Sequence, residues 1–390
     1  MRLYRISDVQ PGMINGKSIF DVDNVLLLSA GFEITPEIIE KLLDRGYNYI
    51  YIMEEGTEEI VPEDIVSFSV RLKASNTLES IVKEIKKLSR FNNATVAEAL
   101  MLFKEDYVLN SPLTFDVRGI VKEIIEDISY AKTKILNTII LKSRATFFVD
   151  HAINTAILAV LIGLKYRLNR KMLTSLAIGS ILHDIGKIVL QQLKGNNDPR
   201  IIKLLYHEHP AFGYRLLKGS SIISPLENQI VFQHHETQDG SGFPSGLKGK
   251  NLPPTQSSDH GGRGFIFRLA EICSVANSYD RTVLNPYDTE QFPPVDVIRK
   301  LIGAAGTELN KNVIKTFVHV VPAYPLGIYV KVIEIDDRSL IGYCGVVAEI
   351  DENDLSKPVI ILITDNHFSK IKPMKVETRQ MKKVRFELLL

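Results

Sequence analysis

Apolar residues recur every three or four positions through the middle of the chain, whereas its end alternates apolar and polar residues. The first pattern is typical of amphipathic helices and the second of half-buried strands. Proline suits a first helical position because it needs no N–H partner there. The expected helices of residues 142–320 run from Phe147 to Tyr166, from Lys171 to Asp184, onward from Pro210 and from Pro225, and from Gly264 to Arg281.

The two ends of the chain have different patterns. Near the N-terminus, strand-like runs at 24–29 and 49–53 flank one helix that Thr35 caps and Gly46 ends. After Pro322, alternation predicts strands at 328–335, 340–350 and 359–364. We therefore expect a mainly α protein with a small α+β module at 1–70, connecting helices at 71–141, a multi-helix domain at 142–320 and a β-rich region at 321–390.

Composition narrows the class of protein. Of 390 residues, 45% are hydrophobic and 24% are charged, which is ordinary for globular protein and too much chain for one modest core. A formal net charge of +1 gives no global reason to expect DNA or membrane binding, and two cysteines exclude a disulfide framework. The first residues lack a signal-peptide core, and the longest apolar run, 152–164, is too short to span a bilayer. We expect a cytoplasmic protein.

Histidines cluster in the expected helical domain. Six of the nine lie between residues 151 and 235. His183 and Asp184 end an expected helix in SILHDIGK, where imidazole and carboxylate project about 100° apart, a geometry suited to two neighbouring cations that share the carboxylate. The adjacent His234 and His235 support this interpretation, because two buried rings without a metal or anion are costly. Imidazole plus carboxylate favours iron, manganese, zinc or nickel over calcium and magnesium.

Several of these residues also have an ordinary interpretation. His151, beside an apolar helix, can be a core histidine with satisfied hydrogen bonds, and His209, before a proline, can be only a cap. Glu236 and Asp239 either orient histidine rings or belong to a solvated turn. Lys187 is either an ordinary surface lysine or, beside a metal pair, a group that holds phosphate oxygens.

At these residues the sequence resembles the HD-GYP family of the HD phosphohydrolase superfamily. The resemblance covers about 142–290, and the order and separations of the motifs agree with the family's. It rests on His151 in HAINTA, His183-Asp184 with Gly186-Lys187 in HDIGK, His209-Pro210 in HPAFG, His234-His235 followed by Glu236, and DGSGFP for the signature DGxGYP.

The resemblance implies an all-helical HD-type domain around two divalent metal ions, iron or manganese first, with zinc or nickel as alternatives. His151, His183 and Asp184 would hold one ion, and Asp184, His209, His234 and His235 the other. Lys187 would contact substrate phosphate and act with Asp184 in catalysis. Substrate would also meet the signature loop at Asp239, Gly240, Gly242 and Phe243.

One helix departs from the family pattern. Six residues after Arg268, Ser274 stands where the family places a metal-binding aspartate, and Asn277 stands for a second aspartate. Glu271, one turn before Ser274, is a candidate substitute ligand.

Three further positions also differ from the family. Phe243 replaces the signature tyrosine and loses one hydroxyl. The family's Arg-Pro-Tyr-basic element appears only as NPYD at 285–288, so an expected phosphate-binding pair is absent. Phe147 stands four residues before His151, where a carboxylate would be needed for a third metal.

The resemblance implies a phosphodiesterase that hydrolyses cyclic di-GMP to pGpG or GMP with hydroxide formed between two cations. The departures favour a second hypothesis: a scaffold that keeps the domain, binds cyclic di-GMP or a signalling protein, and is impaired in catalysis. A phosphohydrolase of another nucleotide is a third. Expected partners are cyclic di-GMP and a diguanylate cyclase or other signalling protein, with no membrane and no DNA. Oligomeric state, the identity of the metal and the signal sensed by the N-terminal module stay open.

Overall fold

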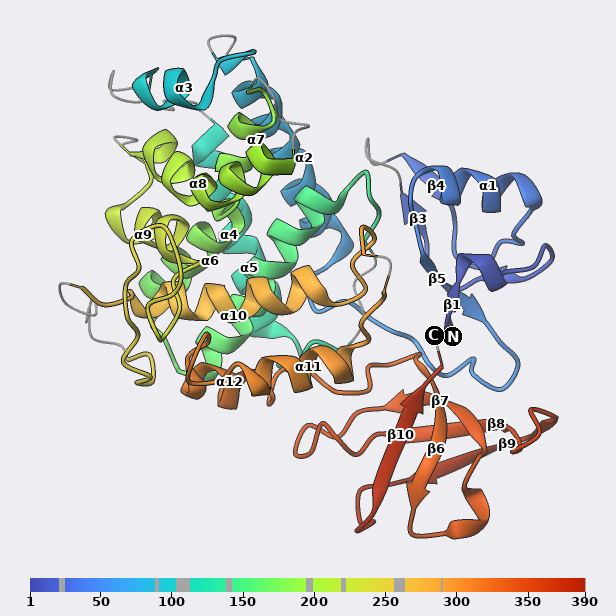
Figure 1. Ribbon diagram of the computed structural model, residues 1–390. Coiled ribbons are helices and arrows are strands. Elements are labelled where there is room, and N and C mark those ends of the chain that lie inside the picture. Colours follow the sequence, from blue (N-terminus) through green and yellow to red (C-terminus); the bar gives the residue numbers. More distant parts are fainter. Residues whose placement is uncertain are drawn as a thin grey trace.

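The computed structural model describes the chain except for residues 21–24, 88–90, 103–112, 138–141, 194–198, 219–221, 256–263, 289 and 390. A helical body carries a small β module at one side and a larger antiparallel sheet below that module (Figure 1). The protein is mainly α, as expected. The helices of the body are α2 (Phe68–Lys86), α3 (Val96–Leu102), α4 (Leu113–Tyr130), α5 (Phe147–Lys165), α6 (Arg170–Leu182), α7 (Gly186–Leu190), α8 (Pro199–Leu217), α9 (Pro225–Gln233), α10 (Arg268–Thr282), α11 (Pro294–Gly303) and α12 (Lys311–Phe317).

The N-terminal module combines short antiparallel strands with one helix. α1 (Pro36–Asp44) begins as predicted, because the Thr35 side chain accepts a hydrogen bond from the Ile38 N–H at 3.4 Å. Its Leu42 is buried in a small core of its own with the strands. The strands form one sheet in the order β1 (Arg2–Arg5), β5 (Tyr49–Met53), β2 (Ile14–Asn15), and one hairpin of β3 (Ile19–Phe20) with β4 (Leu26–Leu28).

α5 is the central helix of the body because it is apolar on almost every face. All residues from 151 to 163 are buried, and α6, α10, α2 and α4 pack against the helix. Each fully buried leucine or isoleucine contributes roughly 1.5–3 kcal/mol of hydrophobic stabilisation. The helix that carries His151 is therefore held in place by packing on all sides.

Two stretches are apolar and long enough to span a membrane, Phe147–Lys165 and Arg170–Leu190. Within them, 78% and 89% of the most apolar window is buried inside the protein. Such burial is typical of core helices in a soluble domain, because their apolar surface already has a protein partner.

Pro210 does not open a helix, so that prediction was wrong. It lies inside α8, and without an N–H it cannot bond the Tyr206 carbonyl four residues earlier. The Nδ1 of His209 lies 2.5 Å from that carbonyl oxygen and takes the place of the missing donor. Packing has overridden the local proline signal here. The predicted start at Pro225 is confirmed, with Ser224 and Glu227 forming a capping box.

The C-terminal sheet is fully antiparallel and closes the molecule near its N-terminus. The three strands predicted after Pro322 are confirmed, whereas β9 and β10 were not predicted. The side chains of β9 are mostly exposed and do not alternate, and β10 was missed although its sequence, VRFEL, alternates apolar and polar residues. Arg2 lies over the Tyr329 ring at 3.5 Å and the Leu389 N–H donates to the Tyr329 carbonyl, so both ends of the chain meet at one strand (Figure 1). The strand order is β10 (Val384–Leu388), β6 (Tyr329–Ile335), β7 (Cys344–Glu349), β8 (Val359–Thr364), β9 (Lys370–Glu377). Domain limits at 70, 141 and 320 stay predictions.

Candidate metal centre

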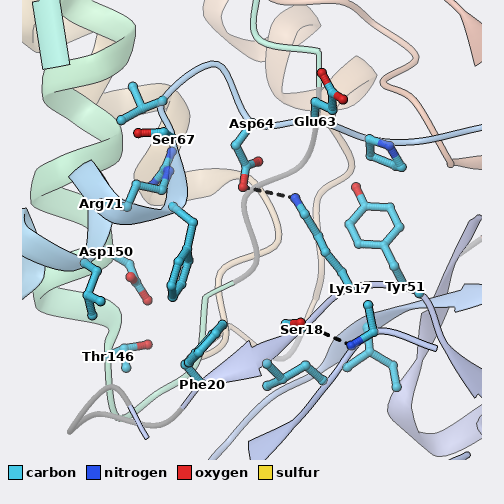
Figure 2. Close-up of a pocket in the computed structure, with 18 of the residues that line it drawn as sticks. Lys17, Ser18, Phe20, Tyr51, Glu63, Asp64, Ser67, Arg71, Thr146 and Asp150 are labelled. Atoms are coloured by element: carbon cyan, nitrogen blue, oxygen red, sulfur yellow. Dashed lines mark hydrogen bonds and ion pairs between the residues drawn. The ribbon is translucent and has the colours of Figure 1, made fainter. Parts of the chain in front are cut away.

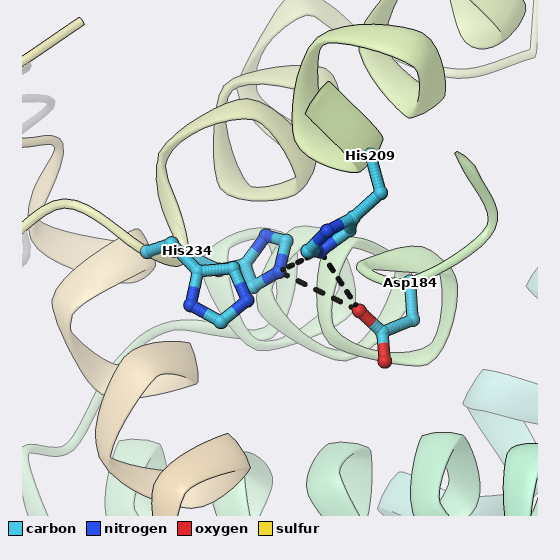
Figure 3. A group of neighbouring side chains, drawn as sticks. Asp184, His209 and His234 are labelled. Carbon is cyan, nitrogen blue, oxygen red and sulfur yellow. Dashed lines mark hydrogen bonds and ion pairs between the residues drawn. The ribbon is translucent and has the colours of Figure 1, made fainter. Parts of the chain in front are cut away.

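All six residues predicted as metal ligands converge in the helical body. His151 comes from the first turns of α5, and His183 and Asp184 follow the last residue of α6. His209 lies in α8, and His234 and His235 follow α9. Figure 3 shows His209 and His234 directed at the carboxylate of Asp184 from separate segments. We call His151, His183, Asp184, His209, His234 and His235 the histidine cluster.

The histidine cluster divides into two groups that share Asp184. In one group, Asp184 Oδ2 lies 3.5 Å from His183 Nε2 and 3.8 Å from His151 Nε2. In the other, Asp184 Oδ1 lies 3.1 Å from His209 Nε2 and 3.7 Å from His234 Nε2. His235 completes the second group, and within each group the potential ligand atoms lie within 4.8 Å of one another. One carboxylate therefore presents one oxygen to each set of rings.

Backbone carbonyls orient three of the rings. His183 Nδ1 lies 2.7 Å from the Ser180 oxygen and His234 Nδ1 lies 2.8 Å from the Val231 oxygen, as His209 does with Tyr206. A carbonyl can only accept, so Nδ1 carries the proton and Nε2 keeps its lone pair toward Asp184. The last turns of α6 and α9 supply the Ser180 and Val231 carbonyls, because helix ends leave acceptors without helical partners, whereas Pro210 frees the Tyr206 carbonyl inside α8.

His151 is oriented by a carboxylate that the sequence analysis missed. Its Nδ1 lies 2.7 Å from Asp280 Oδ2, in α10. Lys142 donates to the Asp280 carbonyl and lies 3.5 Å from Oδ2, with only 1% of its side chain exposed. Burial raises the pKa of Asp280, but Lys142 and His151 outweigh it and the pKa is lowered. The position of Asp280 one helical turn after Asn277 could have identified it as a residue of the site. Nothing in the local sequence marks Lys142.

The electrostatics keep the rings neutral and the acid ionised. Burial brings the pKa of His209 to about 4 and lowers those of His183, His234 and His235. Burial would raise the pKa of Asp184, but Lys187 and the imidazoles outweigh it and hold that pKa well below its usual range. Lys187 Nζ contacts Asp184 Oδ2 directly. Neutral imidazoles and an ionised carboxylate are the metal-binding forms of these groups.

The donor set fits divalent cations. Within the described parts of the chain, His183 Nε2 and His235 Nε2 are buried without a hydrogen-bond partner. An unpaired buried polar group costs about 1–3 kcal/mol, which a coordinate bond to a cation would offset. Imidazole nitrogens with one carboxylate suit transition metals such as iron, manganese and zinc. The histidine cluster can therefore hold divalent metal.

Gly186 brings α7 and α8 together beside the cluster. A Cβ at this position would lie 2.1 Å from the His209 carbonyl oxygen and 2.6 Å from the Gly213 nitrogen. Only a residue without a side chain allows the two backbones to approach so closely. This glycine therefore fixes the distance between Asp184, two residues earlier, and His209.

The signature loop folds back on the cluster through its glycine and its ring. A Cβ on Gly242 would lie 2.4 Å from the His235 carbonyl oxygen, and the Phe243 ring stacks on the His235 ring at 4.6 Å. Glu236 is buried and accepts from the N–H groups of Ser245 and Leu247, both at 2.7 Å. It holds the loop closed rather than orienting a ring.

Asp239 and Gly240 form the exposed turn of that loop. Asp239 Oδ1 accepts from the Thr237 hydroxyl and from the Ser241 N–H and hydroxyl, which lower its pKa to about 2. Of the two interpretations left open for Asp239, the geometry agrees with the solvated turn. Gly240 has φ +85°, a conformation that glycine adopts without strain.

A partly exposed group of rings and cations covers the second set of ligands. Tyr206 lies at its centre, with ring centres 5.4 Å from His235 and 5.6 Å from Phe243. Arg281 donates to the Tyr206 hydroxyl, and Lys187 Nζ lies 5.7 Å from the ring centre. We call Tyr206, Phe243, Lys187 and Arg281 the Tyr206 group. Sequence analysis missed Tyr206 and Arg281, because nothing in their local sequence marks them.

On α10, the residue at the cluster is Asn277 and not Ser274. Asn277 Oδ1 lies 3.1 Å from His151 Nε2, whereas no hydrogen bond or ion pair among the described residues joins Ser274 to the cluster. Glu271 is buried and accepts from Gln238 and Asn310, both at 2.8 Å, so it is engaged away from the cluster. Of the two neutral side chains that replace aspartates of the family, Asn277 is therefore the one beside the histidine cluster.

Comparisons with known proteins identify the domain that holds the cluster. Residues 136–256 match the family model described as HD domain. The chain is 24% identical over 232 residues to cyclic di-GMP phosphodiesterase PdeB of Borreliella burgdorferi, covering 58% of this chain and 54% of the relative. It is 22% identical over 284 residues to a cyclic di-GMP phosphodiesterase of Pseudomonas aeruginosa, covering 72% of this chain and 63% of the relative.

The matched regions thus span between half and two thirds of these two relatives. Among solved structures, an HD-GYP-type protein from Bdellovibrio bacteriovorus aligns over 81% of this chain and 97% of its own, at 17% identity and a TM-score of 0.41. The family match over residues 136–256, the two relatives and the ordered histidine and aspartate motifs agree. Residues 136–256 therefore form an HD domain, and the chain is similar there to HD-GYP-type cyclic di-GMP phosphodiesterases.

Proposed function

We propose that the protein is a metal-dependent phosphodiesterase that hydrolyses cyclic di-GMP to pGpG or GMP. The observation that carries this proposal is the shared carboxylate: Asp184 offers one oxygen to each of two sets of neutral imidazoles. A donor set divided in this way suits two divalent ions, with iron or manganese first and zinc or nickel as alternatives. Two relatives carry the name cyclic di-GMP phosphodiesterase, which supports the choice of substrate.

The proposed ligands are His151, His183 and Asp184 for one ion, and Asp184, His209, His234 and His235 for the other. When bound, such a pair supplies an activated water and neutralises charge on phosphate oxygens. Asp280 and the backbone carbonyls hold the rings with Nε2 toward the ions. Lys187 can turn from Asp184 and donate to a phosphate oxygen once metal neutralises that carboxylate.

The Tyr206 group fits the rest of the substrate. Its rings offer a surface on which a guanine can stack. Its cations, Lys187 and Arg281, lie beside the Tyr206 ring, where they could contact the phosphates of the substrate. Gly240, Gly242 and Asp239 would shape the loop beside it. A diguanylate cyclase or another cytoplasmic signalling protein is the kind of macromolecular partner that this function favours.

The test is hydrolysis by protein of known metal content. Protein purified without oxygen is loaded with Fe²⁺ or Mn²⁺, its metal is measured by mass spectrometry, and cyclic di-GMP and its products are separated by chromatography. We expect pGpG or GMP only from loaded protein. Loaded wild-type protein that leaves cyclic di-GMP uncut would contradict the proposal.

Asn277 favours one alternative, a scaffold that binds cyclic di-GMP without hydrolysing it. An amide stands 3.1 Å from His151 Nε2, so the first set of ligands has only the charge of Asp184 to offset a dication. Calorimetry that shows binding of cyclic di-GMP, with no product formed in the same loaded sample, would support the scaffold. A panel of other cyclic nucleotides tests the remaining possibility of a different substrate.

Restoring a carboxylate at Asn277 should strengthen metal binding. We expect Asn277→Asp to raise the affinity for Mn²⁺ about 10-fold or more, because ligand charge sets the affinity of such sites. Ser274→Asp is the matched variant, since position 274 lies one turn away without contact to the cluster. Titration of the metal-free variants with Mn²⁺ measures the affinity of each. If Ser274→Asp raised the affinity and Asn277→Asp did not, the missing ligand would belong at 274.

Removing the guanidinium of Arg281 should weaken substrate binding more than turnover. We expect Arg281→Gln to raise KM for cyclic di-GMP about 10-fold, because a cation beside Tyr206 is lost while the histidine cluster is unchanged. Arg299→Gln is the control, because Arg299 is an exposed residue of α11 whose ion pair among the described residues is with Asp296. Steady-state kinetics separate KM from kcat. An unchanged KM in Arg281→Gln would remove Arg281 from the substrate site.

A further inference from the structure

A cavity of about 710 Å³ separates the N-terminal module from the helical body, away from the histidine cluster. Three parts of the chain line it: strands of the module, the segment that leads into α2, and the start of α5. Figure 2 shows Lys17, Phe20 and Tyr51 on one side, with Arg71, Thr146 and Asp150 on the other. This volume is in the range of sites for small organic ligands.

Arg71 supplies an anchoring group in the cavity wall. Its Nη1 donates to Asn154 Oδ1 at 3.0 Å, which fixes the direction of the guanidinium. Nε and Nη2 are buried, and in the described part of the chain neither has a hydrogen-bond partner. These two N–H groups form the parallel edge of a guanidinium, the edge that holds a carboxylate or phosphate through two bonds.

The other charges near Arg71 do not satisfy that edge. Lys17 and Asp64 pair with each other at 3.0 Å, so their charges offset (Figure 2). Glu63 is exposed, and Asp150 makes no ion pair with Arg71 within 4.0 Å among the described contacts. Burying the Nε and Nη2 of Arg71 without an acceptor is unfavourable. This indicates that a group from outside the protein accepts hydrogen bonds from them.

Aromatic rings line the cavity on the module side of Arg71. Phe20 of β3 and Phe68 of α2 stack with ring centres 4.3 Å apart. Phe68 precedes Arg71 by one helical turn, so the two side chains are neighbours on one face of α2. Phe68 is 51% exposed, so part of its ring is available to a ligand in the cavity.

We propose that this cavity binds a small organic anion, with its carboxylate or phosphate on the Nε and Nη2 of Arg71 and its flat apolar part against Phe20 and Phe68. The site belongs to the junction of the module with the body. Its existence does not depend on hydrolysis at the histidine cluster. Asn154, which accepts from Arg71, lies one turn after His151, so the residue that holds the anchoring group and a proposed metal ligand share α5.

The experiment uses three naphthalene compounds with the metal-free full chain. 1-Naphthoate carries a carboxylate, 1-naphthyl phosphate carries a phosphate, and 1-naphthalenemethanol carries neither. Binding is followed by calorimetry and by naphthalene fluorescence. We expect saturable binding of at least one anion at one site, and at least tenfold weaker binding of the alcohol. The anion that binds more tightly distinguishes a carboxylate ligand from a phosphate ligand.

Three variants locate the site. Arg71→Gln should weaken binding of the anion at least tenfold, and Phe68→Ala should weaken it severalfold without removing a charge. Arg170→Gln should leave binding unchanged, because that exposed arginine on α6 does not line the cavity and pairs with Glu126 among the described residues. Circular dichroism checks that each variant is folded. The proposal is overturned if neither anion saturates, or if folded Arg71→Gln and Phe68→Ala both bind like Arg170→Gln.

Discussion

Asp184→Asn is expected to remove most of the bound metal and to reduce hydrolysis of cyclic di-GMP about 1,000-fold, or roughly 4 kcal/mol of transition-state stabilisation. Among the residues that the structure describes, Asp184 is the acid whose oxygens reach both sets of imidazoles. Asparagine keeps the shape but not the charge, so neutral rings alone would have to hold two buried dications. Lys187 would also lose its anionic partner and add an unbalanced positive charge beside the ions.

Asp296→Asn is the control for this variant, because it removes one carboxylate from an exposed ion pair with Arg299 on α11. Metal per chain and turnover are measured for both proteins after the same loading procedure. If Asp184→Asn kept its metal content and turnover within threefold of wild type, the shared carboxylate would not be required for metal binding or catalysis.

Gly186→Ala is expected to destabilise the helical body by about 3 kcal/mol or more, because the added methyl group overlaps backbone atoms. Its Cβ would lie 2.1 Å from the His209 carbonyl oxygen and 2.6 Å from the Gly213 nitrogen. Neither atom belongs to a flexible side chain, so α7 and α8 must move apart. That movement would also carry His209 away from Asp184 and weaken metal binding.

Gly119→Ala is the matched control for the steric effect. Gly119 lies inside α4, and no described atom would come within 4 Å of an added methyl group, so alanine should stabilise the helix by about 0.5–1 kcal/mol. Thermal melting followed by circular dichroism compares the two variants. A melting temperature of Gly186→Ala equal to or above that of wild type would contradict the close approach of α7 and α8.

The sequence was sufficient to predict most of the elements and the residues of the histidine cluster, because both depend on residue type and local spacing. Apolar periodicity and caps predicted α1, α5, α9 and three strands of the C-terminal sheet close to their limits. The wrong start at Pro210 has a specific cause. A local rule treats proline as a helix opener, whereas in α8 it releases a carbonyl that orients His209.

Within the site, metal-type residues were recognisable because histidine and aspartate at helix ends have few other reasons to cluster. The residues that position them were not. Asp280 reaches His151 from 129 residues further along the chain, Lys142 in turn contacts Asp280, and neither belongs to a local motif. Ser274 and Asn277 could be distinguished only by which face of α10 meets α5.

By itself, then, the sequence determined that histidines and one aspartate of metal-binding type cluster in the helical domain, and which family their order and spacing resemble. Only the tertiary structure decided how Asp184 divides its oxygens, which side of each ring faces inward, and that Tyr206 and Arg281 stand beside the ligands. The spacing of residues along the chain determines the directions in which their side chains project from one helix. Distances between helices depend on packing of the whole body, including one glycine that lets two backbones touch.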